Sequence, residues 1–143
     1  MPLPHSTEAR PYCRAAQRRL ADAKVLLEHS KANGAHTTGA MYMAGYAVEC
    51  VLKALIVDGT SQTRRSETIS AFRGASGHSY DVLLHRYRMV KGPVIPNETH
   101  LHLSRINTWS TDLRYDPRLE PYQVAAGFIE SVDAIMKWAE MRF

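Results

Sequence analysis

The chain has 143 residues, of which 45% are hydrophobic and 22% are charged, and its formal net charge is +4. This length favours a single domain that buries a core without disulfides or metal, and the composition is globular rather than disordered. Residues 1–92 carry 13 Lys/Arg against 7 Asp/Glu, and residues 93–143 carry 5 against 7. The first part of the chain is therefore basic. This charge favours an anionic partner, or else it belongs to a solvated surface.

The first predicted helix runs from about residue 8 to residue 30. Ser6 or Thr7 is its expected cap, and Pro11 falls in the first turn, where a missing N–H costs nothing. An apolar stripe recurs at helical spacing: Tyr12, Ala16, Leu20, Ala23 and Leu27. A basic stripe, Arg10, Arg14 and Arg18, recurs every four residues, and its role is left open.

The second predicted helix covers about residues 37–57. It is apolar around most of its circumference, which is typical of a central helix. The polar segment that follows, about residues 59–77, is expected to be a long flexible loop with at most one short helical turn near residues 69–72.

Three further helices complete the expected fold. One starts near His78 or Ser79 and ends near Val90, before Gly92 and Pro93. Another covers about residues 97–109, and the last runs on from Pro121 towards the end of the chain. Apolar residues at helical spacing should form the inner faces of these three helices. They are Leu83, Leu84, Tyr87 and Val90 in the first, Leu101, Leu103 and Ile106 in the second, and Ala125, Phe128, Ile129, Val132, Ile135, Met136 and Ala139 in the last. Trp109 is expected to pack in the core or an interface. No segment has the period of a strand, so we predict one all-α domain, residues 1–143, with a bundle of about five helices.

A polar stripe on the second helix is the most informative feature. Its members are Tyr42, Tyr46, Glu49 and Lys53, which fall within roughly 60° of one another at about 100° per residue. Glu49 and Lys53 stand four apart, in the favourable order for an ion pair. The stripe predicts either a seam that lines a groove or dimer interface, or a satisfied network that fixes the helix register.

At this helix the sequence resembles the HEPN domain family. The family pattern A-x-E-x-x-L-K-A-L is matched by Ala47, Glu49, Leu52, Lys53, Ala54 and Leu55. A following Gly-His-x-x-x-x-Leu-Leu is matched by Gly77, His78, Leu83 and Leu84, and a later Trp…Arg-Tyr turn by Trp109, Arg114 and Tyr115. The resemblance covers about residues 10–140. It implies an antiparallel helical bundle, a symmetric homodimer and, in many members, a partner nucleotidyltransferase encoded beside the HEPN chain as a toxin–antitoxin pair.

Many members of that family are metal-independent ribonucleases with an Arg-x4–6-His motif, and others are not catalytic. Arg73 and His78 match the spacing literally. However, the match precedes the third helix, contains two glycines, and has Gly74 where an Asn or Asp often follows the Arg. Neither Arg105 nor Arg114 offers a better match. This departure favours a binding module, with an RNase that uses Arg73 and His78 for catalysis as the alternative.

Other candidate residues have two interpretations each. His78, at a predicted helix N-terminus, either contacts a phosphate or nucleotide, with Arg114 near it, or is a packing histidine bonded to Tyr115 or Glu49. Arg114 either pairs with Asp112 or Asp116 or reaches a ligand phosphate. The residues expected to bind a ligand are Tyr46, Glu49, Lys53, His78, Arg114 and Tyr115.

No metal site and no cofactor is expected. His100 and His102 point about 200° apart on a helix and cannot share an ion. Cys13 and Cys50 lie inside apolar helical patterns and have no zinc spacing. The most apolar segment, 41–57, is interrupted by charges and shorter than the roughly 20 residues of a membrane span. We therefore expect a cytoplasmic protein that binds RNA, a nucleotide or a partner nucleotidyltransferase, with plain helical dimerisation as a third possibility.

Overall fold

The computed structural model describes residues 2–91 and 94–143, and within these ranges every regular element is a helix or a 3-10 turn. The α-helices are α1 (Arg10–Glu28), α2 (Thr37–Gly59), α3 (Arg65–Ser70), α4 (Tyr80–Lys91), α5 (Asn97–Arg105) and α6 (Tyr122–Glu140). The 3-10 turns are η1 (Gln62–Arg64), η2 (Ala75–His78) and η3 (Thr111–Tyr115). The all-α prediction is confirmed, with six α-helices in place of about five.

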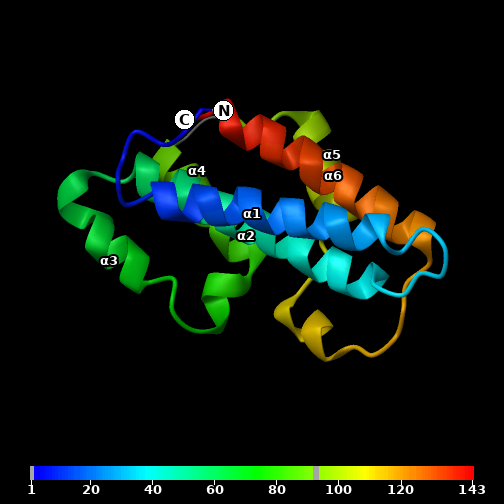
Figure 1. The fold of residues 1–143 in the computed structure, drawn as a ribbon. Coiled ribbons are helices and arrows are strands. Elements are labelled where there is room, and N and C mark those ends of the chain that lie inside the picture. Colours follow the sequence, from blue (N-terminus) through cyan, green and yellow to red (C-terminus); the bar gives the residue numbers. More distant parts are fainter. Residues whose placement is uncertain (1, 92–93) are drawn as a thin grey trace.

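Helix α2 is the centre of the bundle. Of its 23 residues, 17 are buried, and it packs against α1, α4 and α6 (Figure 1). Burial on nearly every side explains why the helix is apolar around most of its circumference. Most of the stability of a helix in a protein comes from tertiary packing, and the burial of α2 on nearly every side provides it here.

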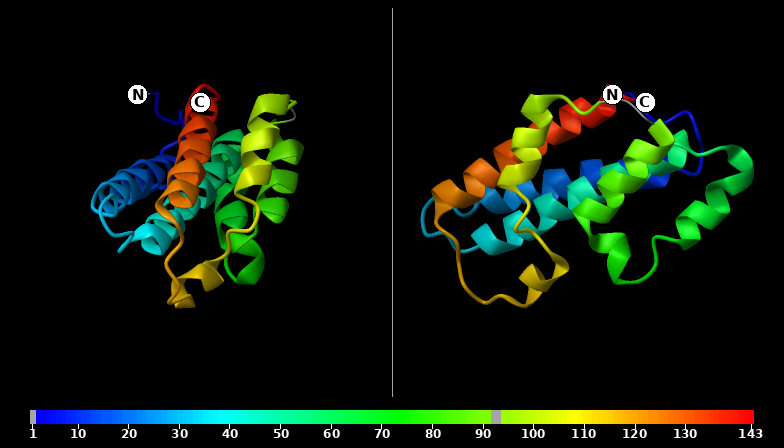
Figure 2. Two further views of the ribbon diagram at one scale, coloured as in Figure 1. Left: turned by 90° about the vertical axis from the view of Figure 1, so that its right-hand side faces the viewer. Right: turned by 180° about the vertical axis from the view of Figure 1, so that it is seen from behind.

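The other long helices are amphipathic and each turns one apolar stripe to the core. Helix α1 lies antiparallel to α2, α6 crosses both, and α5 packs on α6 (Figures 1 and 2). The inner residues expected for the last helix are all buried: Ala125, Phe128, Ile129, Val132, Ile135, Met136 and Ala139. Two expected inner residues are not, because Leu101 is 52% exposed and Val90 is 36% exposed.

Residues 59–77 are not a plain loop, and that expectation is corrected. The segment contains η1, α3 and η2, which together project from the bundle at the α3 end of Figure 1. None of the six residues of α3 is buried, so the short helix has no apolar stripe that a sequence pattern could reveal. The helix break expected at Gly92 and Pro93 lies outside the described residues.

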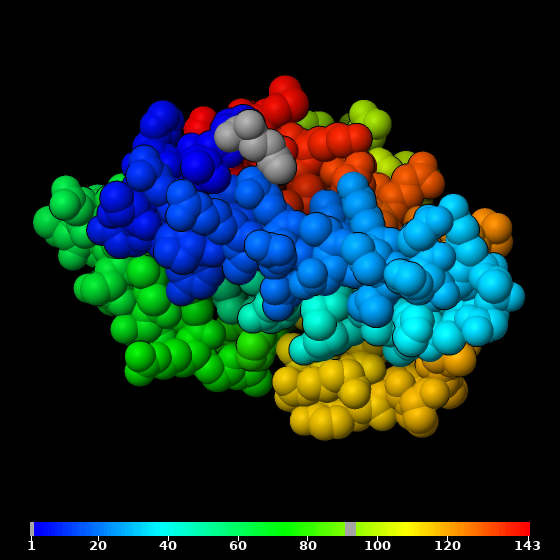
Figure 3. All heavy atoms as spheres, in the orientation of Figure 1, coloured from blue at the N-terminus to red at the C-terminus, as the bar shows by residue number. Residues whose placement is uncertain are grey.

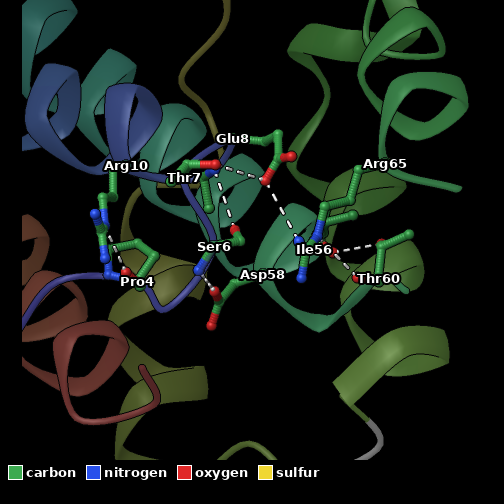
Figure 4. A network of polar contacts seen from close by, with 10 residues as sticks. Pro4, Ser6, Thr7, Glu8, Arg10, Ile56, Asp58, Thr60 and Arg65 are labelled. Atoms are coloured by element: carbon green, nitrogen blue, oxygen red, sulfur yellow. Dashed lines mark hydrogen bonds and ion pairs between the residues drawn. The ribbon is translucent and has the colours of Figure 1, made fainter. Parts of the chain in front are cut away.

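A polar network ties this segment to the start of the chain (Figure 4). The Arg65 guanidinium donates to Glu8 at 3.3 Å and to the Thr60 carbonyl at 3.1 Å. The backbone N–H of Ser6 donates to Asp58 at 2.9 Å, and the Ser6 hydroxyl accepts from the N–H of Ala9 at 3.2 Å. The end of α2, the start of α3 and the entry to α1 are therefore held together.

One helix, Thr37–Gly59, is long and apolar enough to cross a membrane by length and composition alone. In the bundle, 83% of its most apolar window is buried by the other helices. The core helix of a globular domain has the same composition, so this feature is weak evidence for a span.

Both cysteines are buried, and burial raises the pKa of Cys13 to about 11 and that of Cys50 to about 12. Only the thiolate is nucleophilic. We therefore expect neither thiol to react with a disulfide reagent at pH 8 in the folded protein, whereas both react in denaturant. Absorbance of the released thiol measures this, and rapid labelling of the native protein would contradict the packing of α1 on α2.

Candidate functional site

The carboxylate of Glu49 is the centre of the polar stripe on α2. Glu49 is only 1% exposed, and its Oε1 accepts from Lys53 Nζ at 2.7 Å. The same oxygen lies 3.0 Å from Nδ1 of His78, which comes from η2. The expected ion pair of Glu49 and Lys53 is thus present, and a histidine distant in sequence joins it. Among the described residues, Glu49 Oε2 has no hydrogen-bond partner.

Two contacts place His78 on this carboxylate. Gly77 packs directly against the backbone carbonyl of Phe72, in a space where a Cβ atom would overlap the oxygen. The Phe72 ring in turn covers Lys53, whose Nζ lies 5.4 Å from the ring centre. The turn that carries His78 is therefore folded back onto α2, and glycine at position 77 is required for this close approach.

The hydrogen bond to Glu49 fixes the orientation of the imidazole. Nδ1 faces the buried carboxylate, so Nε2, on the opposite side of the ring, points away from it. The side chain of His78 is 43% exposed, whereas that of Glu49 is buried. The result is an accessible histidine nitrogen supported from behind by a carboxylate, an arrangement that suits hydrogen bonding to a ligand or proton transfer.

Four stacked aromatic rings lie beside the cluster of Glu49, Lys53 and His78. We call these rings the aromatic ladder: Tyr80, Trp109, Tyr42 and Tyr46. Trp109 stacks between Tyr80, at 5.2 Å, and Tyr42, at 6.1 Å. It also packs directly over Gly45, where a larger residue would overlap the indole. The Tyr80 hydroxyl donates to the Gly45 carbonyl at 2.6 Å, and Trp109 Nε1 donates to the Tyr42 carbonyl at 3.2 Å. The expectation that Trp109 packs in the core is confirmed by its 6% exposure.

A groove of about 340 Å³ opens beside His78. One wall is η2 and the first turn of α4, and the other is the connection from α5 to η3. Figure 3 shows the green region around η2 and the gold region that begins with η3 side by side at the lower edge of the molecule. Besides the rings of Tyr80 and Trp109, the polar side chains that line the groove are His78, Ser79, Asp81, Asn107, Ser110 and Thr111.

The structure gathers some of the residues expected at a site and separates others. Glu49, Lys53 and His78 converge, and Tyr46 adjoins them at the end of the aromatic ladder. Arg73 is exposed in the turn before η2 and does not line the groove.

Arg114 and Tyr115 lie on η3, and Arg114 reaches Tyr42 of the aromatic ladder. The Arg114 guanidinium lies 4.9 Å from the Tyr115 ring centre, and interaction with Tyr115 and then with Tyr42 raises its pKa. Asp116 pairs with Arg118 at 2.9 Å rather than with Arg114, and the hydrogen bonds from Arg118 hold the pKa of this carboxyl at about 2. Of the two packing partners expected for His78, Glu49 is the one to which it bonds. The basic stripe of Arg10, Arg14 and Arg18 is exposed on α1, away from the groove lining.

Several groove residues were missed in the sequence. Asn107, Ser110 and Thr111 surround Trp109 in the chain, and this run of hydrogen-bonding residues around a buried tryptophan was an available signal. Asp81 gave no signal, because an acidic residue in the first turn is ordinary for a helix. Over residues 2–91 and 94–143, no group of three or more His, Cys, Asp or Glu side chains is placed to hold a metal ion.

The fold and the site thus define an all-α bundle whose central helix presents a Glu–Lys pair to a histidine from the following turn. The HEPN domain family model matches residues 9–142, nearly the whole chain. The chain therefore belongs to the HEPN domain family, as its motifs had suggested. Neither the curated proteins nor the solved structures gave a match.

Proposed function

We propose that this HEPN domain is a non-catalytic binding module that forms a homodimer in the cytoplasm and binds RNA or a nucleotide in the groove beside His78. The observation that carries the proposal is the hydrogen bond between Glu49 and His78, 3.0 Å long, which fixes an accessible imidazole at the lip of a polar groove. A partner nucleotidyltransferase in a toxin–antitoxin pair belongs to the same proposal and rests on the family alone.

The charge of the groove argues against phosphoryl chemistry there. Cleavage of RNA develops negative charge on the phosphate, which needs a cation or strong donors at that point. Among the described side chains, no Lys or Arg lines the groove, and Arg73 lies outside it. Lys53 is only 8% exposed and its Nζ is held by Glu49. The groove can therefore hold a ligand without stabilising the transition state of its cleavage.

A metal-independent RNase that uses Arg73 and His78 is the second candidate. The observation in its favour is again the hydrogen bond between Glu49 and His78. A carboxylate that holds one histidine nitrogen leaves the other nitrogen able to accept or release a proton. For this function Arg73 would have to move to the groove on RNA binding. Binding and cleavage must therefore be measured on one preparation.

The test uses the purified chain, whose mass in solution is first measured by light scattering to check the dimer. Fluorescence anisotropy with labelled single-stranded RNA then reports binding, and incubation with total RNA in EDTA reports cleavage. We expect binding without cleavage, and a loss of affinity of roughly tenfold in His78→Ala, about the value of one hydrogen bond to a charged or strongly polar group.

His29→Ala is the matched control, because His29 is exposed at the end of α1 and lies outside the groove lining. Cleavage that disappears in both His78→Ala and Arg73→Ala would establish the RNase instead. The absence of any binding to RNA or nucleotide would reject both functions.

A further inference from the structure

The lining of the groove beside His78 is polar but not basic. Asp81 contributes a carboxylate, and the remaining polar side chains besides His78 are an amide and three hydroxyls. A groove that binds phosphates is normally lined with Arg or Lys. A carboxylate at this place repels a phosphate, so the groove suits a neutral group that forms hydrogen bonds.

The start of α4 strengthens this conclusion. A helix N-terminus ordinarily attracts anions, but here Ser79, just before α4, and Asp81, in its first turn, take that role. The Ser79 hydroxyl accepts from the N–H of Val82 at 3.4 Å, and Asp81 places its carboxylate in the first turn. A phosphate at this end of α4 would displace the Ser79 hydroxyl from the N–H of Val82 and would be repelled by the Asp81 carboxylate.

Each wall of the groove carries a hydrogen-bonding group that is unused within the described part of the protein. Among the described residues, neither the Asp81 carboxylate nor the Asn107 amide has a partner within the protein. Asp accepts from an exocyclic amino group of a base, and Asn both donates to and accepts from adenine. The groove volume of about 340 Å³ is near the lower end of the roughly 300–1,000 Å³ typical of small-ligand sites. The space therefore suits one small planar group rather than a length of strand.

We infer that the groove receives a single nucleobase that carries an exocyclic amino group, while the phosphates of the ligand stay outside. This inference rests on the proposed function and specifies which part of the ligand is recognised. Asp81 accepts from the amino group, Asn107 bonds the adjoining edge of the base, and His78 Nε2 bonds the base or the ribose at the lip. Uracil, which has no amino group, is the disfavoured base.

The experiment compares short single-stranded RNAs of equal length and charge by anisotropy: one of adenosine, one of uridine and one with abasic sites at alternate positions. We expect the adenosine strand to bind at least about fivefold more tightly than either of the others. Asp81→Asn and Asn107→Ala are each expected to bring this ratio close to one. Glu98→Gln is the matched control, because Glu98 is an exposed acid in the first turn of α5, outside the groove lining.

Competition separates the sources of the base. Free adenosine that displaces the strand would show that a nucleoside alone fills the groove, and displacement by AMP but not by adenosine or inorganic phosphate would contradict exclusion of the phosphate. Equal affinity for all three strands would overturn the inference while leaving an RNA-binding module in place. Failure to bind any strand or nucleotide would remove the proposed function and this inference with it. Thermal unfolding by circular dichroism checks that each surface variant is folded.

Discussion

Glu49→Ala is expected to lower the free energy of unfolding by about 3–5 kcal/mol. The substitution removes the only carboxylate that contacts Lys53 among the described residues and leaves an ammonium group in a site that is 8% exposed. The Phe72 ring at 5.4 Å offsets only part of this loss. Urea unfolding followed by circular dichroism measures the change.

A double variant separates the charge effect from the loss of side-chain volume. Because replacing both members of a buried pair by apolar groups is often neutral, Glu49→Leu with Lys53→Met is expected to recover most of the stability. A double variant as unstable as Glu49→Ala would mean that volume and not charge dominates. A Glu49→Ala variant within about 1 kcal/mol of the wild type would show that water reaches Lys53 and that the pair is a surface pair.

Gly45→Ala is expected to destabilise the protein by about 2–3 kcal/mol, although alanine is the better helix former. The added methyl group would overlap the Trp109 indole, whose movement is restrained by stacking with Tyr80 and Tyr42 and by the hydrogen bond from its Nε1 to the Tyr42 carbonyl. Relief of the overlap requires the aromatic ladder to shift. Near-UV circular dichroism should therefore change together with the urea midpoint.

Gly127→Ala provides the matched control on α6. No atom lies within 4 Å of the position that its Cβ would take. We expect this substitution to stabilise the protein by about 0.5–1 kcal/mol, the ordinary gain from replacing a helical glycine. Equal effects of the two substitutions would mean that Trp109 does not pack over Gly45 as described.

The long helices were predictable because burial imposes a period on their sequences. The inner residues of α6 all follow from spacing, and so does the central position of α2, which is apolar around most of its circumference. The segment from η1 to η2 was not, because none of the residues of α3 is buried. Its helical turns are held instead by polar contacts of Arg65 with Glu8 and Thr60, which no local pattern encodes.

Contacts of the site within one helix were predictable from the sequence, whereas contacts between distant segments could not be fixed from it. The pairing of Glu49 with Lys53 follows from their spacing of four residues. The sequence left Tyr115 and Glu49 open as partners of His78, and the close approach of Gly77 to Phe72, which only the tertiary structure reveals, places His78 on Glu49. For the same reason Arg114 could not be placed beside Tyr42, and Asn107 could not be assigned to the same groove as Asp81.

The two carbonyls of α2 that accept from Tyr80 and Trp109 belong to residues 45 and 42, three positions apart on one rigid helix. Both walls of the groove are therefore fixed to neighbouring points of the same element, and the width between them is set before any ligand arrives. A slot that is already open at its final width has little conformational entropy to lose on binding. The fixed width of such a slot selects ligands by their size, and it disfavours any ligand that requires the walls to move apart.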